Sequence, residues 1–485
     1  MADRAPRRVG RPLTALPEEP MTAPTTRAKP APFNGYYTPV SQDTDSALTA
    51  AGPGTPGGDY LRRFWHPIAM ASEVKDTPLP LRVLGEELVL FRDLSGRLGL
   101  VHRHCSHRGT SLEYGIIGPD GIRCAYHGWK YAIDGTVLET PSEPPRSRLK
   151  DSFSHGAYRT HEYAGLIFAY MGPPEATPEF PVYDSLTWPD GNELVPYKLE
   201  MPCNWLQVHE NAADPIHTAY LHAIVSGVQF TPAFAELPEL EFMETPIGLL
   251  SIATRRCGQN LWIRASDVIL PNVAQFGTGF VDGSKEKFAL CAAFTRWIVP
   301  IDDTHCWVIG VRHFNPVIDP RNEGRADRIG LGRIDLMGQT DERPYAERQK
   351  NPGDWDAMVA QGPIAIRANE HLASTDKGVA MLRRQLRNGM RDVQQGIEPR
   401  MPQRYPGGPV PTYNNETILG VPALVPDDAA VMRAFGNKIC RTVIDSAALP
   451  PGRRQAEVEA RVRAMQAEGA FYPQALPETR LAENL

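Results

Sequence analysis

The chain has 485 residues and a mass of 53.7 kDa, with 42% hydrophobic and 22% charged residues, which is enough for two substantial cores. Its formal net charge of -6 argues against nucleic acid or an anionic membrane as the main partner, because either would favour a basic surface. The sequence has no run of the roughly 20 apolar residues that a membrane span needs, and its first residues lack the apolar core of a signal peptide. With seven cysteines, an odd number, we expect a protein of the reducing cytoplasm.

Residues 1–45 are rich in Pro, Ala, Thr and Arg and show no hydrophobic period. A segment of this composition cannot bury enough apolar surface to order itself, so we expect a disordered or extended N-terminal arm.

Residues 46–180 are predicted to form an all-β domain. From about Tyr60 to Tyr170, short apolar runs alternate with turns that contain Gly, Asp and Pro. The Pro-rich stretch from Met171 to Asp184 then reads as a linker.

Two short motifs in this domain offer metal ligands in matched pairs. Cys105-Ser106-His107 is a CxH motif, and Cys124-Ala125-Tyr126-His127 is a CxxH motif. Two thiolates on one iron and two imidazoles on the other form the Rieske type of [2Fe-2S] cluster. A tetrahedral zinc site has the same ligand set, but zinc fingers usually group Cys with Cys and His with His.

The stretches RHCSHRGTSLEYG and IRCAYHGWKYAIDG resemble the Rieske domain of ring-hydroxylating oxygenase large subunits. The resemblance implies that Cys105 and Cys124 bind the inner iron and that His107 and His127 bind the outer iron. Gly109 and Gly128 are expected to let the backbone approach the sulfurs, and Trp129 to shield the site. His102 and His104 stand in the wrong order for ligands.

Residues 181–400 show a mixed pattern that predicts an α+β domain. Residues 204–222 look helical, residues 247–315 contain long β-like runs, and residues 363–388 form an amphipathic segment of helix length. We expect a helix-grip-like arrangement around an antiparallel sheet. Residues 401–485 are interpreted as a C-terminal extension with a charged peripheral helix.

A second set of candidate ligands lies in the helical segment, where Asp214 and His217 lead on to His222. Two histidines and one carboxylate form the facial triad of a non-heme Fe(II) site, which leaves positions open for O2. A separation of five residues is about 140° around an ideal helix, so both histidines reach one metal only if the helix bends or ends between them. Asp-x2-His-x4-His resembles the mononuclear-iron signature of the same oxygenases.

The third ligand is predicted to be Asp376. Leu372, Asp376, Val379, Leu382 and Leu386 follow a helical spacing, which places a carboxylate in an apolar stripe where it needs a partner. The segment resembles the ligand-bearing helix of phthalate dioxygenase-type oxygenases. Arg383 is an alternative partner for Asp376, and Glu370 is the second candidate ligand.

The resemblance also implies how the chain works with its partners. It implies a homotrimer in which Asp214 bridges a Rieske histidine of one subunit and an iron-ligand histidine of the next. The chain has no GxGxxG motif that opens a βαβ unit, so NAD(P)H oxidation is expected on a separate reductase with flavin and a ferredoxin-type cluster.

We therefore expect the terminal oxygenase of a Rieske system, which uses O2 to hydroxylate or O-demethylate a small, aromatic organic substrate. The sequence GPGTPGGDYLRRFWHPIAMASEV resembles the phthalate dioxygenase, dehydrodivanillate O-demethylase and tertiary-alcohol hydroxylase branch. Candidate pocket residues are Phe230, Phe234, Trp262 and Phe276. A Rieske electron carrier without oxygenase chemistry is the alternative, but it leaves His217, His222 and Asp376 without a role. A zinc-stabilised binding protein is a third reading.

Overall fold

The computed structural model describes residues 32–188, 191–279, 281–318, 329–333, 338–402, 408–424 and 428–472. Residues 1–41 and residues 42–485 form separate compact units. Within the first unit, the described part contains one 3-10 turn, Gly35–Tyr37. Most of the predicted N-terminal arm lies outside the described residues.

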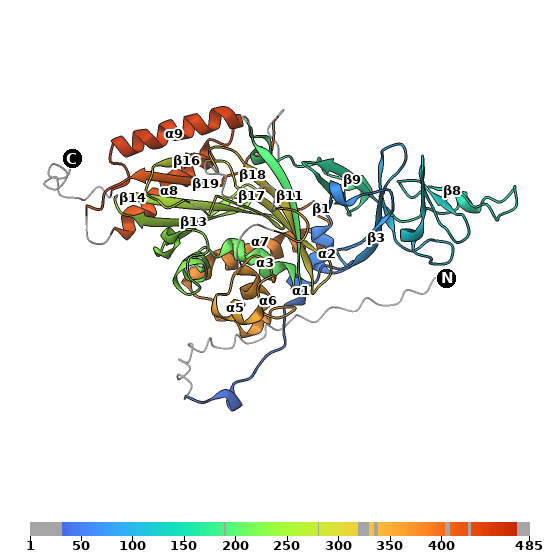
Figure 1. The fold of residues 1–485 in the computed structure, drawn as a ribbon, viewed down its shortest axis with the longest axis horizontal. Coiled ribbons are helices and arrows are strands. Elements are labelled where there is room, and N and C mark those ends of the chain that lie inside the picture. The colour runs from blue at the N-terminus through green and yellow to red at the C-terminus, as the bar shows by residue number, and fades with distance from the viewer. Residues whose placement is uncertain are drawn as a thin grey trace, which may run out of the picture. The chain divides into compact units, whose positions relative to one another are not determined.

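The strands of residues 65–170 form two sheets (Figure 1). The six-stranded sheet has the order β1-β10-β9-β4-β3-β2 and consists of β1 (Trp65–Met70), β2 (Leu79–Val83), β3 (Glu86–Arg92), β4 (Leu98–His102), β9 (Ala157–Tyr163) and β10 (Leu166–Tyr170). The four-stranded sheet follows chain order and consists of β5 (Ile116–Gly118), β6 (Gly121–Arg123), β7 (Lys130–Tyr131) and β8 (Val137–Glu139). The predicted all-β unit is therefore confirmed.

The third sheet is antiparallel and has nine strands within the described residues. Its main path runs β11-β18-β17-β15-β14-β13-β12, and β19 joins β14 to β16. The strands are β11 (Glu193–Met201), β12 (Glu239–Thr245), β13 (Gly248–Cys257), β14 (Asn260–Ile269), β15 (Val273–Phe276), β16 (Lys287–Ala289), β17 (Phe294–Pro300), β18 (Cys306–Phe314) and β19 (Asn415–Gly420). Nearly every residue of β13 and β14 is buried, because helices or loops cover both faces of this sheet.

Helices pack on both faces of the nine-stranded sheet. The described helices of this domain are α3 (Trp205–Glu210), α4 (His217–Ala219), α5 (Tyr345–Lys350), α6 (Asp354–Val359), α7 (Lys377–Gln394), α8 (Ala429–Asp445) and α9 (Pro451–Ala467). In Figure 1, α3 and α7 lie on one side of the sheet and α9 lies on the other. Two further helices, α1 (Ser46–Thr49) and α2 (Pro56–Leu61), precede the first sheet, and α2 begins at a Thr55 cap that accepts a bond from Gly58 N at 3.0 Å.

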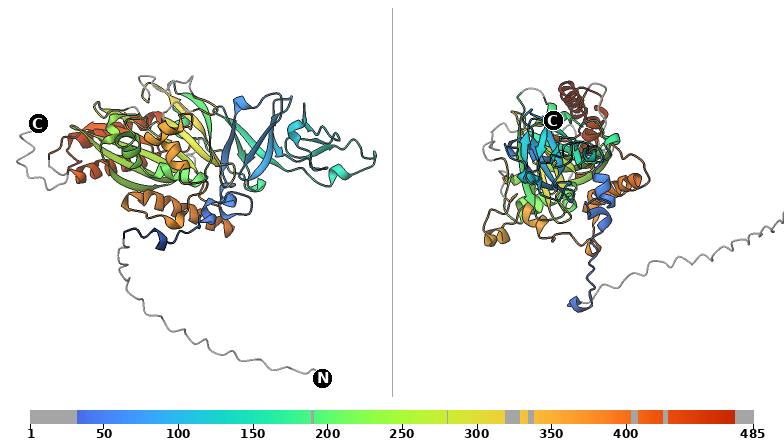
Figure 2. Two further views of the ribbon diagram at one scale, coloured as in Figure 1. Left: turned by 60° about the horizontal axis from the view of Figure 1, so that its bottom comes forward. Right: turned by 90° about the vertical axis from the view of Figure 1, so that its right-hand side faces the viewer.

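The segment beyond residue 400 is integrated into the domain of the nine-stranded sheet. Strand β19 pairs with β14 over six residues, and Arg454 of α9 forms a buried ion pair with Asp184 at 2.8 Å. Figure 2 shows α8 and α9, in red, at the end of this sheet away from the blue and cyan strands of the first domain. The sheet is thus completed by residues distant in sequence, and the predicted boundary at residue 400 divides elements that share one sheet.

The two β-rich domains share one hydrophobic core. The Leu84 and Gly85 amides of the β2–β3 turn donate to the carbonyls of Pro300 and Ile301, at 2.8 and 2.9 Å. Lys198 of β11 pairs with Glu73 at 3.1 Å. Among the described residues, no helix combines the length and the apolar character that a membrane crossing requires.

Candidate cluster-binding loops and metal centre

The two Cys/His motifs occupy two loops with the same backbone pattern. In the loop after β4, Cys105 N donates to Thr110 O and Gly109 N donates to Cys105 O, both at 2.9 Å. In the loop between β6 and β7, Cys124 N donates to Trp129 O at 2.8 Å and Gly128 N donates to Cys124 O at 3.0 Å. Gly109 and Gly128 have φ values of +80° and +72°, so their role is to close these turns in a conformation that residues with a Cβ rarely adopt.

The four predicted ligands converge between these loops. The rings of His107 and His127 have centroids 4.5 Å apart, and Cys105 and Cys124 are both buried. Burial raises the pKa of the Cys105 thiol, to which Tyr131 Oη (3.0 Å) and the His107 amide are hydrogen-bonded. His107 Nδ1 is buried and has no hydrogen-bond partner among the described residues, as expected of an atom reserved for a metal bond. The donor set fits a Rieske cluster.

Aromatic side chains enclose this centre. The ring of Trp129 stacks on that of His107 with a centroid distance of 4.6 Å and an interplanar angle of 8°. Behind the first loop, His155 Nδ1 is 2.7 Å from Ser106 Oγ and its Nε2 is 2.9 Å from His102 O, while its ring stacks on Tyr131. Trp129 therefore covers a ligand ring as predicted.

His102 and His104 lie outside the ligand set, as their order in the sequence indicated. His102 Nε2 is 3.4 Å from a carboxylate oxygen of Glu86, and His104 Nε2 is 3.1 Å from one of Glu87. Both side chains are exposed.

The second pair of histidines lies where the helix changes its geometry. His217 begins the short helix α4, and His222 lies in a π-helical turn, Tyr220–Ile224, closed by a bond from Val225 N to Tyr220 O at 2.8 Å. The wider π turn brings residues five apart onto one side, which an ideal α-helix does not do. The ring centroids of His217 and His222 are 5.3 Å apart, so the expected departure from ideal helix geometry is present.

The carboxylate between these histidines belongs to Asp354, the first residue of α6. Asp354 Oδ1 is 3.6 Å from His217 Nε2, and Asp354 Oδ2 is 3.3 Å from His222 Nε2. One ligand atom from each of the three residues lies within 4.8 Å of the other two. Metal bonds of about 2.0–2.2 Å place neighbouring ligand atoms roughly 3 Å apart, so the three donors fit one ion with little movement.

Neighbouring side chains fix the orientation of the three donors. His222 Nδ1 is 2.9 Å from Gln229 Oε1, which leaves His222 Nε2 for the centre of the site. His217 Nδ1 is bonded to the backbone carbonyl of Asp214 and is 3.9 Å from the Asp214 carboxylate. Asn211 Nδ2 donates to Asp354 Oδ1 at 3.2 Å.

The loop before Asp354 depends on two glycines. Gly338 and Gly353 approach so closely that a Cβ built on Gly353 would lie 2.3 Å from Gly338 Cα. This contact brings Gln339 beside Asp354, and Gln339 Nε2 donates to Asp354 Oδ2. Burial raises the pKa of Asp354, but the charges of His222 and His217 and the bonds from His222 and Gln339 outweigh burial, so the pKa lies well below its usual range.

The structure corrects the prediction for the third ligand, because Asp376 does not join the two histidines. Asp376 lies at the start of α7, where its Oδ2 accepts a bond from Ala373 N at 2.6 Å. Leu372 is exposed and precedes the helix, so the apolar stripe begins only at Val379 and Asp376 is a helix-terminal acid.

The second candidate ligand, Glu370, also lies elsewhere. Its carboxylate pairs with Arg383 at 2.5 Å and with Arg367 at 3.4 Å, and both arginines also bind Glu210 of α3. Arg383 therefore pairs with Glu210 and Glu370 in a partly buried ion-pair network.

A cavity opens beside His217, His222 and Asp354. Its apolar wall includes Phe230, Phe234 and Phe276, three of the four predicted pocket residues. Trp262 lies behind Phe234, with ring centroids 5.5 Å apart, and is fully buried. Beside these rings the lining carries three arginines of the sheet, Arg255, Arg264 and Arg296, which no sequence motif had singled out.

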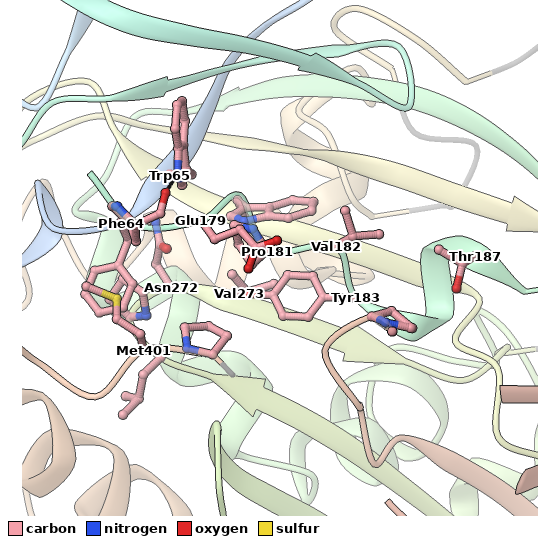
Figure 3. Close-up of a pocket in the computed structure, with 17 residues that line it drawn as sticks. Phe64, Trp65, Glu179, Pro181, Val182, Tyr183, Thr187, Asn272, Val273 and Met401 are labelled. Carbon is pink, nitrogen blue, oxygen red and sulfur yellow. Dashed lines mark hydrogen bonds between the residues drawn. The ribbon is translucent and has the colours of Figure 1, made fainter. Parts of the chain in front are cut away.

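A larger cavity lies at the interdomain linker and is the one drawn in Figure 3. Phe64, Trp65, Val182, Tyr183 and Met401 contribute to its mostly apolar wall, and Glu179 points toward it. Its described lining contains no histidine or cysteine, and Glu179 is its single carboxylate.

The remaining predicted residues have structural roles. His209 is fully buried, and burial lowers its pKa to about 3, as expected of a neutral core histidine. Cys203, Cys291, Cys306 and Cys440 are buried free thiols, and Cys257 is partly buried.

Comparison with known proteins identifies the first domain and gives relatives along most of the chain. Residues 64–159 match the Rieske [2Fe-2S] domain. The chain is 41% identical over 411 residues to the tert-butanol monooxygenase / tert-amyl alcohol desaturase oxygenase subunit of Aquincola tertiaricarbonis, over 80% of this chain and 86% of that protein. It is 37% identical over 377 residues to the phenoxybenzoate dioxygenase subunit alpha of Ectopseudomonas oleovorans, over 75% and 88%.

A solved structure supports the fold. Dicamba monooxygenase bound to 3,6-dichlorosalicylic acid superposes with a TM-score of 0.53 over 69% of this chain and 98% of that chain, at 16% identity. The chain therefore belongs to the large (alpha) subunits of Rieske non-heme iron oxygenases. It is the terminal oxygenase component, an oxidoreductase with a [2Fe-2S] cluster and mononuclear iron that depends on O2 and on separate electron-transfer partners.

Proposed function

We propose that the chain oxidises a small organic molecule in the cavity beside a mononuclear iron bound by His217, His222 and Asp354. The observation that carries this proposal is the convergence of these three donors from two segments distant in sequence. In the same proposal, Cys105, His107, Cys124 and His127 bind the [2Fe-2S] cluster. The cluster supplies electrons one at a time, and the mononuclear iron is where O2 is activated.

The protein's own residues prepare the site for this chemistry. Gln229 holds His222 through Nδ1, and the Asp214 carbonyl holds His217 through Nδ1, so both imidazoles present Nε2. Phe230 and Phe234 cover His222, with a centroid distance of 4.8 Å for Phe230, and keep bulk water from the reaction site.

We also propose that Asp214 carries electrons between subunits of a homotrimer. Figure 1 shows β8, from the sheet that carries the second Cys/His loop, and α3, which precedes the two histidines in the chain, in different regions of residues 42–485. We therefore propose that electrons reach the mononuclear iron of one subunit from the cluster of a neighbouring subunit, and not from the cluster of the same chain. The Asp214 side chain is 30% exposed and 3.9 Å from His217 Nδ1, which suits a residue with one partner inside and one outside the chain.

The reductase is proposed to be a separate NAD(P)H-dependent protein of the flavin and ferredoxin type. None of the seven cysteines, all of which lie within the described residues, forms a disulfide, in keeping with a cytoplasmic location. The relatives include a tert-butanol monooxygenase, a phenoxybenzoate dioxygenase and a 5,5'-dehydrodivanillate O-demethylase, so similarity leaves both hydroxylation and O-demethylation open.

Metal analysis of paired variants tests the site. Wild-type protein should be red-brown, with about three irons and two acid-labile sulfides per chain. Asp354→Ala should lose about one iron and all substrate oxidation while it keeps the cluster spectrum, and Asp376→Ala should keep all three irons. Iron loss in Asp376→Ala with retention in Asp354→Ala would refute the assignment. Stoichiometric zinc without sulfide would refute the proposal as a whole.

A further inference from the structure

Three arginines concentrate positive charge at the cavity beside His217, His222 and Asp354; Arg255 is fully buried, and Arg264 and Arg296 are half-buried. Arg255 of β13, Arg264 of β14 and Arg296 of β17 all line it. Its lining contains two carboxylates, Asp354 and Asp214, and a metal ion at the proposed site would offset Asp354. The cavity therefore carries net positive charge before any ligand enters.

Among the described residues, Arg264 forms no ion pair, although the charges of Glu416 and Asp354 act on it from a distance. Its Nη2 donates to Gly277 O at 3.0 Å, and its Nε is buried with no hydrogen-bond partner in the described ranges. Glu416 lies directly opposite Arg264 in the pairing of β14 with β19, but Glu416 forms its ion pair with Lys287 at 2.6 Å. Burial lowers the pKa of Arg264, which reflects the cost of this incompletely neutralised charge.

Arg296 is similarly unsatisfied. Its side-chain hydrogen bond within the described residues is a long one, from Nη2 to Asn211 Oδ1 at 3.4 Å, and its Nε is buried without a partner among them. Its guanidinium lies 4.6 Å from the ring centroid of Phe276, which fixes the plane of the group.

Arg255 is the third arginine that lines the cavity. It is fully buried and donates to Glu236 O at 3.1 Å and to Thr218 Oγ1 at 2.7 Å, but its Nη1 has no partner in the part of the chain that the structure describes. It stacks on Phe234 and Trp262 at 5.2 and 5.4 Å.

A charged group is costly to withdraw from water without a counter-charge, and a guanidinium presents donors in a planar fork that matches a carboxylate. The rest of the wall is aromatic, with Phe230, Phe234 and Phe276 beside the arginines. We propose that the substrate is a small aromatic carboxylate, whose carboxylate binds Arg264 and Arg296 and whose ring packs against these phenylalanines. This inference rests on the proposed function and specifies the substrate class of the same site.

Ligand binding by metal-loaded, oxidised protein tests the inference, because no turnover occurs without a reductase. Calorimetry compares benzoate, salicylate and phthalate with the neutral amide of each acid. At least one acid should bind tenfold or more tightly than its amide. Arg264→Gln and Arg296→Gln should each lower the affinity for that acid at least tenfold. The affinity for its amide should change less than threefold. Arg384 is an exposed arginine of α7, and Arg384→Gln should leave the affinities for the acid and for the amide unchanged.

Two results would overturn the inference: every acid binds no more tightly than its amide, or both arginine variants keep wild-type affinity for the acid. Metal content of the same preparations separates this test from that of the proposed function. Arginine-dependent acid binding by protein that cannot hold mononuclear iron would refute the proposed function and leave the carboxylate site standing.

Discussion

His222 and Gln229 form a hydrogen bond of 2.9 Å between Nδ1 and Oε1, and the amide nitrogen of Gln229 donates to Pro352 O at 2.8 Å. One glutamine thus connects a histidine of the π turn to the backbone two residues before Asp354. It positions two of the three proposed ligands, although it contacts no ligand atom that faces the metal.

Gln229→Ala should therefore weaken binding of mononuclear iron by about 10- to 100-fold, because residues that orient metal ligands typically have effects of this size. Iron titration of protein stripped of its mononuclear metal measures the affinity, while the cluster spectrum should not change. Gln361→Ala, an exposed glutamine in the turn after α6, is the matched control. Wild-type iron affinity in Gln229→Ala would show that the glutamine has no positioning role.

Tyr131 is predicted to raise the reduction potential of the cluster through its hydroxyl, 3.0 Å from Cys105 Sγ. A bond that favours the reduced, more negative cluster by about 1 kcal/mol raises a one-electron potential by roughly 40 mV. Tyr131→Phe should lower the potential by this amount in a spectroelectrochemical titration, and Tyr114→Phe, an exposed tyrosine of the same domain, should not. An unchanged potential in Tyr131→Phe would mean that the hydroxyl does not act on the sulfur.

Asp214→Asn should retain the metals and the assembly state of the wild type but slow electron delivery by orders of magnitude. The variant loses the carboxylate that is 3.9 Å from His217 Nδ1 and that is proposed to meet a Rieske histidine of the next subunit. Single-turnover mixing of reduced protein with substrate and O2 measures cluster oxidation directly. A wild-type oxidation rate, or a monomeric native protein, would contradict the proposed path.

Asp267 should make stability depend on pH, because burial raises its pKa to about 7. Between pH 4 and pH 7 the unfolded chain ionises this group while the folded chain keeps it protonated, so stability falls as pH rises, by on the order of 4 kcal/mol. Asn can still accept the bonds that Tyr413 N and Asn414 N donate to Oδ2. The melting temperature of Asp267→Asn minus that of the wild type should therefore increase from pH 5 to pH 7.5. A constant difference across this range would exclude the linkage.

The groups of ligands that lie within short segments follow from the sequence alone. Cys105 and His107, like Cys124 and His127, lie within single turns, so their spacing already specifies how the ligands group. His217 and His222 could be paired by their motif, and the spacing of five residues already required a departure from the ideal helix, which the π turn supplies.

The tertiary structure decided which carboxylate meets those histidines. Asp354 has no distinguishing local pattern, whereas Asp376 fitted a helical stripe that in fact starts after it. The contact of Gly338 with Gly353 and the bond from Gln229 to Pro352 bring Asp354 to the site.

The same holds for the charged wall of the cavity. Arg255, Arg264 and Arg296 come from three strands, and strand β19 joins the sheet from a segment interpreted as an extension. Long-range strand pairing sets these neighbours, and a sequence pattern with a period of two or 3.6 residues reports only which face of its own element a residue occupies.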